Sequence, residues 1–278
     1  MISPSQQVSA AGDGLGVAVA QFAPGADTAE NLATITRLAE RAVSRGASLV
    51  VFPEYSSYFS EPFGEGFLDN AEPIDGEFVT RLADVSHRLQ IHIVAGMIET
   101  AARHDRFSNT VVAVSPQGAV VAAYRKLHLY DAFGSRESDF VEPGSIAAPE
   151  TFEVGDFTVG LQTCYDIRFP EMTRRLVDAG ADLVLVPAEW VRGVLKEHHW
   201  RTLVTARALE NTIYVAAADH TPPVGVGASL VVDPMGVAVA SLAENEDVAV
   251  AWITRTRVDD VRLVNPALAL RRFGIHEL

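Results

Sequence analysis

The feature that most constrains the fold is an alternation between apolar runs of strand length and segments of helical period. Residues 16–22 (GVAVAQF) and 48–52 (SLVVF) have the length and composition of buried strands. Between them, residues 28–45 repeat apolar side chains at helical spacing, with Thr28 as the expected N-terminal cap. This order predicts a β-α-β unit and an α/β fold.

The alternation continues along the chain and adds a predicted hairpin at the turn Pro116-Gln117-Gly118. Parallel and antiparallel strands are therefore expected in one mixed sheet. The further predicted strands are 91–97, 110–115, 119–125, 157–164, 183–186, 213–218, 229–233, 237–242 and 248–253. The further predicted helices are 76–89, 170–179, 196–210 and 258–264.

Residues 127–149 lack this periodicity and are rich in Gly, Ser, Pro and charge. A long irregular segment inside a compact domain is usually functional. No linker divides the chain, so we expect a flexible N-terminal extension, 1–14, and a single domain with a C-terminal tail, 15–278. Residues 45–53 resemble residues 179–187, which suggests two similar halves, although chance similarity between two buried strands explains the match equally well.

Charge and cysteine content limit the partners. A formal net charge of −14 and a pI of about 4.9 disfavour nucleic acid and anionic membranes. No apolar run is long enough to span a bilayer, and residues 1–14 do not have the pattern of a secretory signal. A single cysteine excludes an intrachain disulfide and fits a reducing compartment. We expect a cytoplasmic protein that binds a small molecule, with no nucleic-acid or membrane partner.

Three reactive residues lie at the carboxyl ends of predicted strands: Glu54, Lys126 and Cys164. In α/β sheets, ligands collect beyond the carboxyl ends of strands. Cys164 also precedes a predicted helix, whose N-terminal N–H groups are expected to favour the thiolate. Taken singly, the cysteine is explained as a small buried hydrophobe, and the other two as surface charges. Together they supply a nucleophile, a base and a cation for an oxyanion.

Several motifs resemble the nitrilase superfamily of carbon–nitrogen hydrolases, over residues from about 16 to about 255. They are FPE at 52–54, YRKLHL at 124–129, GLQTCYDIRFPE at 160–171, Glu137-Ser138 before Pro143-Gly144, and His199-Trp200 followed by ARALEN at 206–211. The resemblance implies a catalytic triad in which Glu54 is the general base, Lys126 stabilises the oxyanion and Cys164 is the nucleophile. It implies a second acid, Glu137, in the irregular segment.

The resemblance also implies a four-layer α-β-β-α sandwich, a homodimer, and hydrolysis through a cysteine thioester without a cofactor. The motif style is closest to amidases of small carboxylate-bearing monoamides, such as omega-amidases and deaminated glutathione amidases. Alternatives are a nitrilase, an N-carbamoyl amidohydrolase, or a catalytically inactive binding protein. An inactive protein has no chemical reason to retain Glu54, Lys126 and Cys164 together.

Other conspicuous residues have structural explanations. Tyr165 and Trp190 follow strand ends and are expected to form substrate-binding walls, with core packing as the equal alternative. The neighbouring His198 and His199 lack a third ligand at suitable spacing, so we expect no metal site. Two charge pairs at helical spacing, Arg168 with Glu171 and Arg207 with Glu210, are expected to be packing ion pairs.

Overall fold

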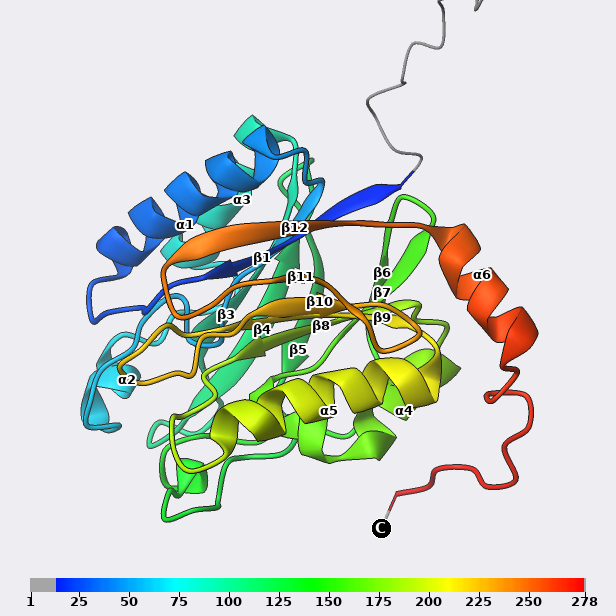
Figure 1. Ribbon diagram of the computed structural model, residues 1–278. Coiled ribbons are helices and arrows are strands. Elements are labelled where there is room, and N and C mark those ends of the chain that lie inside the picture. The colour runs from blue at the N-terminus through cyan, green and yellow to red at the C-terminus, as the bar shows by residue number, and fades with distance from the viewer. Residues whose placement is uncertain (1–13, 278) are drawn as a thin grey trace, which may run out of the picture.

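A computed structural model describes residues 14–277, so residues 1–13 of the expected N-terminal extension lie outside it. The chain forms two six-stranded sheets (Figure 1). The first has the order β12-β1-β2-β3-β4-β5 and the second β11-β10-β9-β8-β7-β6. The strands are β1 Leu15–Gln21, β2 Leu49–Val51, β3 His92–Thr100, β4 Phe107–Val114, β5 Val120–Arg125, β6 Thr151–Val154, β7 Phe157–Leu161, β8 Leu183–Ala188, β9 Tyr214–Asp219, β10 Leu230–Val232, β11 Ala238–Ser241 and β12 Asp247–Ile253.

Apolar side chains divide the molecule into layers. The inner faces of the sheets pack on each other, with Val19 and Val51 of the first in one core with Leu161 and Leu185 of the second. Helices α1 (Thr28–Ser44) and α3 (Glu77–Leu89) cover the outer face of the first sheet. Helices α4 (Pro170–Asp178) and α5 (Lys196–Asn211) cover the second (Figure 1). The predicted four-layer α-β-β-α sandwich is confirmed.

The two sheets share one plan. In each, three parallel strands separated by helices lie at the centre: β1, β2 and β3 in the first, and β7, β8 and β9 in the second. Each continues into an antiparallel pair, β4-β5 or β10-β11, and takes one antiparallel strand, β12 or β6, on its other edge. The repeated segments 45–53 and 179–187 therefore belong to two similar halves.

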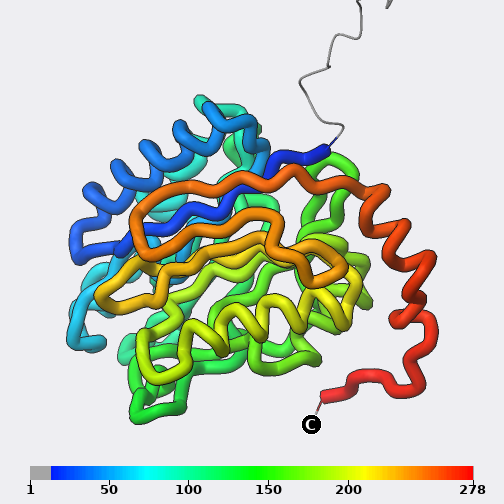
Figure 2. Tube along the Cα trace, in the orientation of Figure 1, coloured from blue at the N-terminus to red at the C-terminus, as the bar shows by residue number. Residues whose placement is uncertain are grey.

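The last strand of the chain lies next to the first. Figure 2 shows β12 beside β1, and the two pair antiparallel along their whole length. Helix α6 (Arg255–Val264) and residues 265–277 then run along one end of the sandwich (Figure 2). No helix of residues 14–277 is both long and apolar enough to cross a membrane.

The structure differs from the sequence-based expectation in local details. Asp27, not Thr28, caps α1, because its carboxylate accepts from the backbone N–H groups of residues 29 and 30 at 2.8 and 3.1 Å. The expected single mixed sheet is two mixed sheets. Helix α2 (Glu65–Asp69), strand β6 and a 3₁₀ turn at Glu137–Asp139 were not predicted, because three to five residues are too short to show periodicity.

Candidate active site

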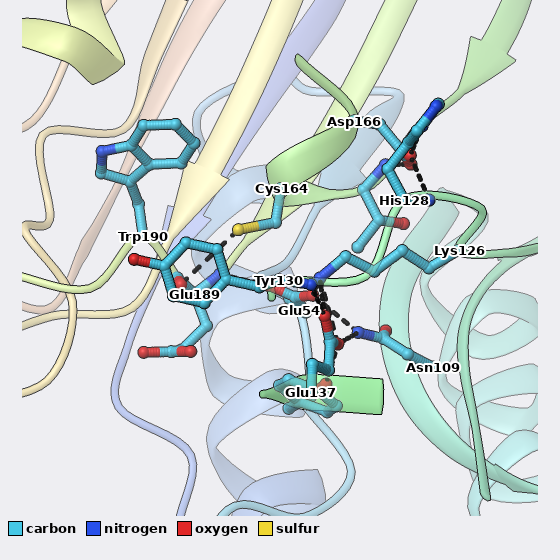
Figure 3. A network of polar contacts seen from close by, with 12 residues as sticks. Glu54, Asn109, Lys126, His128, Tyr130, Glu137, Cys164, Asp166, Glu189 and Trp190 are labelled. Atoms are coloured by element: carbon cyan, nitrogen blue, oxygen red, sulfur yellow. Dashed lines mark hydrogen bonds and ion pairs between the residues drawn. The ribbon is translucent and has the colours of Figure 1, made fainter. Parts of the chain in front are cut away.

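A cavity of about 450 Å³ opens where several strands of both sheets end. Glu54 follows β2, Lys126 follows β5, Cys164 follows β7, and Glu137 comes from the 3₁₀ turn in the irregular segment. All four line the cavity, and Figure 3 shows their side chains converging. The structure thus brings together the four residues that the sequence singled out.

Lys126 joins two carboxylates. Its Nζ donates to Glu54 Oε1 at 2.9 Å and to Glu137 Oε2 and Oε1 at 2.9 and 3.1 Å (Figure 3). The three side chains are between 1% and 7% exposed. A buried lysine of this kind is compensated only because both carboxylates are close.

Two further residues hold these carboxylates and were not identified from the sequence. Asn109 Nδ2, from β4, donates to Glu54 Oε1 at 2.7 Å and to Glu137 Oε1 at 3.0 Å. Tyr55 OH donates to Glu137 Oε1 at 2.6 Å. An amide near the start of β4, just before an apolar run, was the available signal for Asn109.

The backbone around Glu54 is fixed from several sides. Tyr55 has a left-handed φ of 56°, which turns the chain directly after Glu54. Gly96 lies so close that a Cβ there would meet Tyr55 N at 2.6 Å. His220 Nε2 lies 2.6 Å from the Glu54 carbonyl oxygen, so it carries the proton and donates, and burial lowers the pKa of His220 to about 4.

Cys164 sits at a sharp turn between β7 and a 3₁₀ helix, Cys164–Arg168, with a left-handed φ of 42°. Its Sγ donates to the Glu189 carbonyl oxygen at 3.5 Å, and Glu189 N–H donates to Glu54 Oε2 at 2.7 Å. The backbone of Glu189 therefore links the thiol to the carboxylate of Glu54.

The two carboxylates next to Lys126 have pKa values shifted in opposite directions. Burial raises the pKa of Glu54, although Lys126 partly offsets this. Burial also acts on Glu137, but Lys126 and Tyr55 outweigh it and lower the pKa of Glu137. Burial alone would lower the pKa of Lys126, whereas Glu137 and Glu54 raise it well above its usual value. One carboxylate is therefore suited to accept a proton and the other to remain charged.

The thiol is protonated at rest. Burial, together with the Glu54 carboxylate, raises the pKa of Cys164 well above its usual value, and Lys126 lowers it only in part. The N–H groups of the short 3₁₀ turn, which were expected to favour the thiolate, do not offset this desolvation. A neighbouring base must take the proton during attack.

A buried carboxylate ties the cysteine turn to the segment after β5. Asp166 accepts from Thr163 N–H at 2.9 Å, from Tyr124 OH at 2.7 Å and from His128 N–H at 3.1 Å. His128 Nδ1 lies 2.8 Å from the same carboxylate (Figure 3). These contacts fix Cys164 relative to Lys126, which precedes His128 by two positions.

The predicted wall residues Tyr165 and Trp190 both line the cavity. Trp190 is 2% exposed, and its Nε1 donates to Lys196 O at 2.8 Å. Of the two predicted ion pairs, Arg207–Glu210 forms at 2.7 Å. The predicted Arg168–Glu171 pair is wrong: Arg168 points toward Trp190 instead, with 5.0 Å between its Cζ and a ring centroid of Trp190.

Comparison with known proteins identifies the family of this chain. Residues 16–263 match the family described as carbon-nitrogen hydrolase. A deaminated glutathione amidase from Escherichia coli O157:H7 is 38% identical over 94% of this chain and 99% of its own length. The NitFhit protein of C. elegans is 30% identical, with a TM-score of 0.84 over 93% of this chain and 65% of its own.

An amidase from Nesterenkonia sp. AN1 is 26% identical, with a TM-score of 0.78 over 92% of this chain and 97% of its own. That structure is of a glutamate-to-glutamine mutant of the amidase and shows covalent addition of the acetamide moiety of fluoroacetamide at the active site cysteine. The chain belongs to the carbon–nitrogen hydrolase family, within the nitrilase superfamily. The predicted family and the predicted class of reaction, hydrolysis of a carbon–nitrogen bond, are confirmed.

Proposed function

We propose that this enzyme hydrolyses the amide of a small carboxylate-bearing acid through a thioester on Cys164. The observation that carries the proposal is the cavity in which Cys164 lies beside a lysine and two carboxylates of opposite pKa shift. The name of the E. coli relative, a deaminated glutathione amidase, supports an amide substrate. The adduct on the active site cysteine of the Nesterenkonia amidase supports a covalent route.

In the first step, Glu54 accepts the thiol proton as Cys164 Sγ attacks the amide carbonyl carbon. The carbonyl oxygen becomes negative, and the Lys126 ammonium and the backbone N–H of Tyr165 stabilise it. A carboxylate with a raised pKa suits this role, because it holds the proton more readily than an ordinary glutamate does.

The tetrahedral intermediate then collapses. Glu54 gives the proton to the departing nitrogen, so ammonia or an amine leaves and a thioester remains on Cys164. Glu54 next takes a proton from water, which attacks the thioester, and returns that proton to the sulfur as the acid leaves. Glu137 stays ionised throughout and holds Lys126 in position.

Trapping the intermediate tests the proposal. Intact-protein mass spectrometry after rapid acid quench is expected to detect a substrate-dependent acyl mass on the Cys164 peptide. Added hydroxylamine is expected to divert product to the hydroxamate. If no amide gave an adduct, an acyl adduct and hydroxamate from a nitrile would assign the enzyme to the nitrilases. A carbamoyl adduct and hydroxyurea from an N-carbamoyl compound would assign it to the N-carbamoyl amidohydrolases. Substrate binding without turnover of any of the three would indicate an inactive binding protein.

We also propose that the enzyme is a cytoplasmic homodimer. Apolar side chains on α6 and the C-terminal tail support a second copy as partner, because Leu263, Val264 and Phe273 are 81%, 76% and 91% exposed. A nucleophilic thiol must stay reduced, which supports a reducing compartment. Light scattering coupled to gel filtration tests the dimer, and removal of residues 265–278 is expected to weaken it.

A further inference from the structure

The chain contains only two lysines, and both line the same cavity. Lys196 begins α5 and is 6% exposed. Its Nζ donates to Tyr130 OH at 2.9 Å and lies 4.5 to 5.1 Å from the ring centroids of Phe133, Tyr130 and Trp190. Aromatic faces and one neutral hydroxyl therefore surround this ammonium.

Arg168, four positions after the nucleophile, lies against the same aromatic side chains. Its Cζ is 5.0 Å from a ring centroid of Trp190 and 5.5 Å from that of Phe133. Its Nε and Nη2 are buried and have no hydrogen-bond partner within residues 14–277. Lys126, by contrast, has two carboxylates within 3 Å.

These two cations have no counter-anion in the part of the chain that the structure describes, where no carboxylate lies within 4 Å of either. Burial lowers the pKa of Lys196, and the charge of Arg168 adds to this decrease, whereas Cys164 and Glu189 oppose it. The carboxyl of Glu189 lines the cavity as well, but burial raises its pKa well above the usual value, which favours its neutral form. A bound carboxylate would supply the compensating charge.

We propose that Lys196 and Arg168 form the subsite that binds the carboxylate of the amide substrate. Lys196 lines the cavity and supplies a point charge held by Tyr130. Arg168 is not among the residues that line the cavity, and its N–H fork, which is unpaired among residues 14–277 and matches a carboxylate, is buried against the same aromatic rings. Tyr130 also connects this subsite to the reacting groups, because its backbone N–H donates to Glu137 Oε2 at 2.5 Å. The assignment rests on the proposed amidase function, and it adds that the enzyme rejects a carboxylate with an adjacent ammonium, since two cations repel it.

Three amides of similar length separate the preference for a carboxylate from the rejection of an ammonium. Succinamate has the carboxylate, butanamide has a methyl group in its place, and L-asparagine has the carboxylate and an adjacent ammonium. The wild-type kcat/KM is expected to be about 10- to 100-fold higher for succinamate than for butanamide. It is expected to be at least about tenfold higher than for L-asparagine. Equal values for succinamate and butanamide would overturn the subsite, and equal values for succinamate and L-asparagine would overturn the rejection of ammonium.

Lys196→Met and Arg168→Met keep side-chain length and remove charge. Each is expected to reduce the succinamate-to-butanamide ratio to near one, and Lys196→Arg to retain most of it. Arg201→Met is the matched control, because this cation on the same helix is 42% exposed and pairs with Glu197 at 3.1 Å. It is expected to keep the wild-type ratio. An equal loss for both amides in Lys196→Met would indicate a structural role and contradict the proposal.

Calorimetric titration of the Cys164→Ala protein with succinamate and butanamide gives a readout without turnover. Tighter binding of succinamate, lost in the Cys164→Ala, Lys196→Met double variant, supports the subsite even if the wild type hydrolyses no amide, in which case only the proposed function fails. Turnover of amides with no carboxylate preference in either assay would overturn the subsite and leave the amidase function intact.

Discussion

The two halves of the sandwich have the same strand order but end corresponding strands in different residues. Val17 pairs with Leu49 in the first half as Val159 pairs with Leu183 in the second. By this register Phe22 corresponds to Cys164. Phe22 packs edge-on against Phe52 with 6.3 Å between ring centroids, whereas Cys164 faces the cavity. The two halves thus place corresponding strand ends in the same way. The side chain at that position determines whether it packs in the core or faces the cavity.

Two glutamates near the ends of β2 and β8 extend the comparison. Glu54 accepts hydrogen bonds from Lys126, Asn109 and the Glu189 N–H. Glu189 has a buried Oε1 without a partner among residues 14–277. Burial raises the pKa of both, but only Glu54 has a lysine beside it to keep its charge accessible. In the proposed mechanism, the neighbours supplied by β5 and the irregular segment, rather than the strand end itself, distinguish Glu54 as the base.

The largest expected effect separates Cys164 from Phe22. Cys164→Ala is expected to lower turnover by a factor on the order of 10⁴ or more with little change in melting temperature, because it removes the nucleophile but little volume. Phe22→Ala is expected to cost about 3–5 kcal/mol of unfolding free energy, since it empties core volume. Amide turnover and thermal unfolding of both variants measure this. Activity of Cys164→Ala within tenfold of wild type would contradict the assignment.

The next effect separates Glu54 from Glu189. Glu54→Gln is expected to lower kcat by about 10²- to 10⁴-fold with a smaller change in KM, because it acts on the transition state. Glu189→Gln is expected to retain most of kcat, as its side chain takes no proton in the reaction. Steady-state kinetics of the two matched variants compare them. A similar loss of kcat in both would remove the distinction.

The neighbours of Glu54 are tested by Lys126→Ala and Glu137→Gln. Lys126→Ala is expected to lower kcat about as much as Glu54→Gln, since it removes the oxyanion partner. It also leaves two buried carboxylates unpaired, at a cost of about 3–5 kcal/mol, so circular dichroism must accompany the kinetics. Glu137→Gln is expected to be milder, with changes in both kcat and KM. An increase in KM with unchanged kcat for Lys126→Ala would contradict its role.

The acid limb of the pH profile tests the charge of Glu54. The base must be ionised, and its pKa is raised above 4.5. Activity in kcat/KM is therefore expected to fall as pH decreases through a value above 4.5. Asn109→Ala removes a donor to this carboxylate and is expected to move the limb to still higher pH. A limb at or below 4.5 would assign it to another group.

The smallest effect concerns stability. The pKa of Glu189 is raised in the folded protein, so its contribution is complete below the unfolded pKa of about 4.5 and declines as pH rises toward the folded value. Glu189→Gln removes this decline. The variant is expected to gain stability relative to wild type above pH 4.5, by at most about 1.4 kcal/mol per pH unit. Denaturant unfolding at pH 5, 6 and 7 measures the gain, and no trend would mean that Glu189 is ionised.

The order of strands and helices could be predicted because long apolar runs and helical periods are strong signals. The meeting of Glu54, Lys126 and Cys164 in one cavity could be predicted as well, since each lies at the end of such a run within a recognisable motif. Thr28 was wrongly predicted as a cap, because sequence alone does not distinguish adjacent capping residues at a helix start. The irregular segment could be recognised, but the position of Glu137 within it relied on resemblance.

The remaining parts of the site depend on contacts that cross between strands. Asn109 directly precedes a predicted strand, and its two carboxylate partners lie 55 and 28 positions away. The sequence places Lys196 at a helix start but does not reveal its partner Tyr130, which lies 66 positions away. The left-handed φ of Tyr55 and Cys164 has no sequence signal, because neither is glycine. Predicting such features requires knowledge of the strand register in both sheets.

The single cysteine has a practical consequence. Because Cys164 is the only thiol in the chain, each covalent label counts one catalytic centre. A thiol reagent small enough to enter the cavity therefore titrates the working fraction of a preparation, and one mole per mole of protein is the ceiling. Oxidation of that one sulfur also removes activity. The fraction of activity lost is therefore expected to equal the fraction of thiol lost at every time of oxidation.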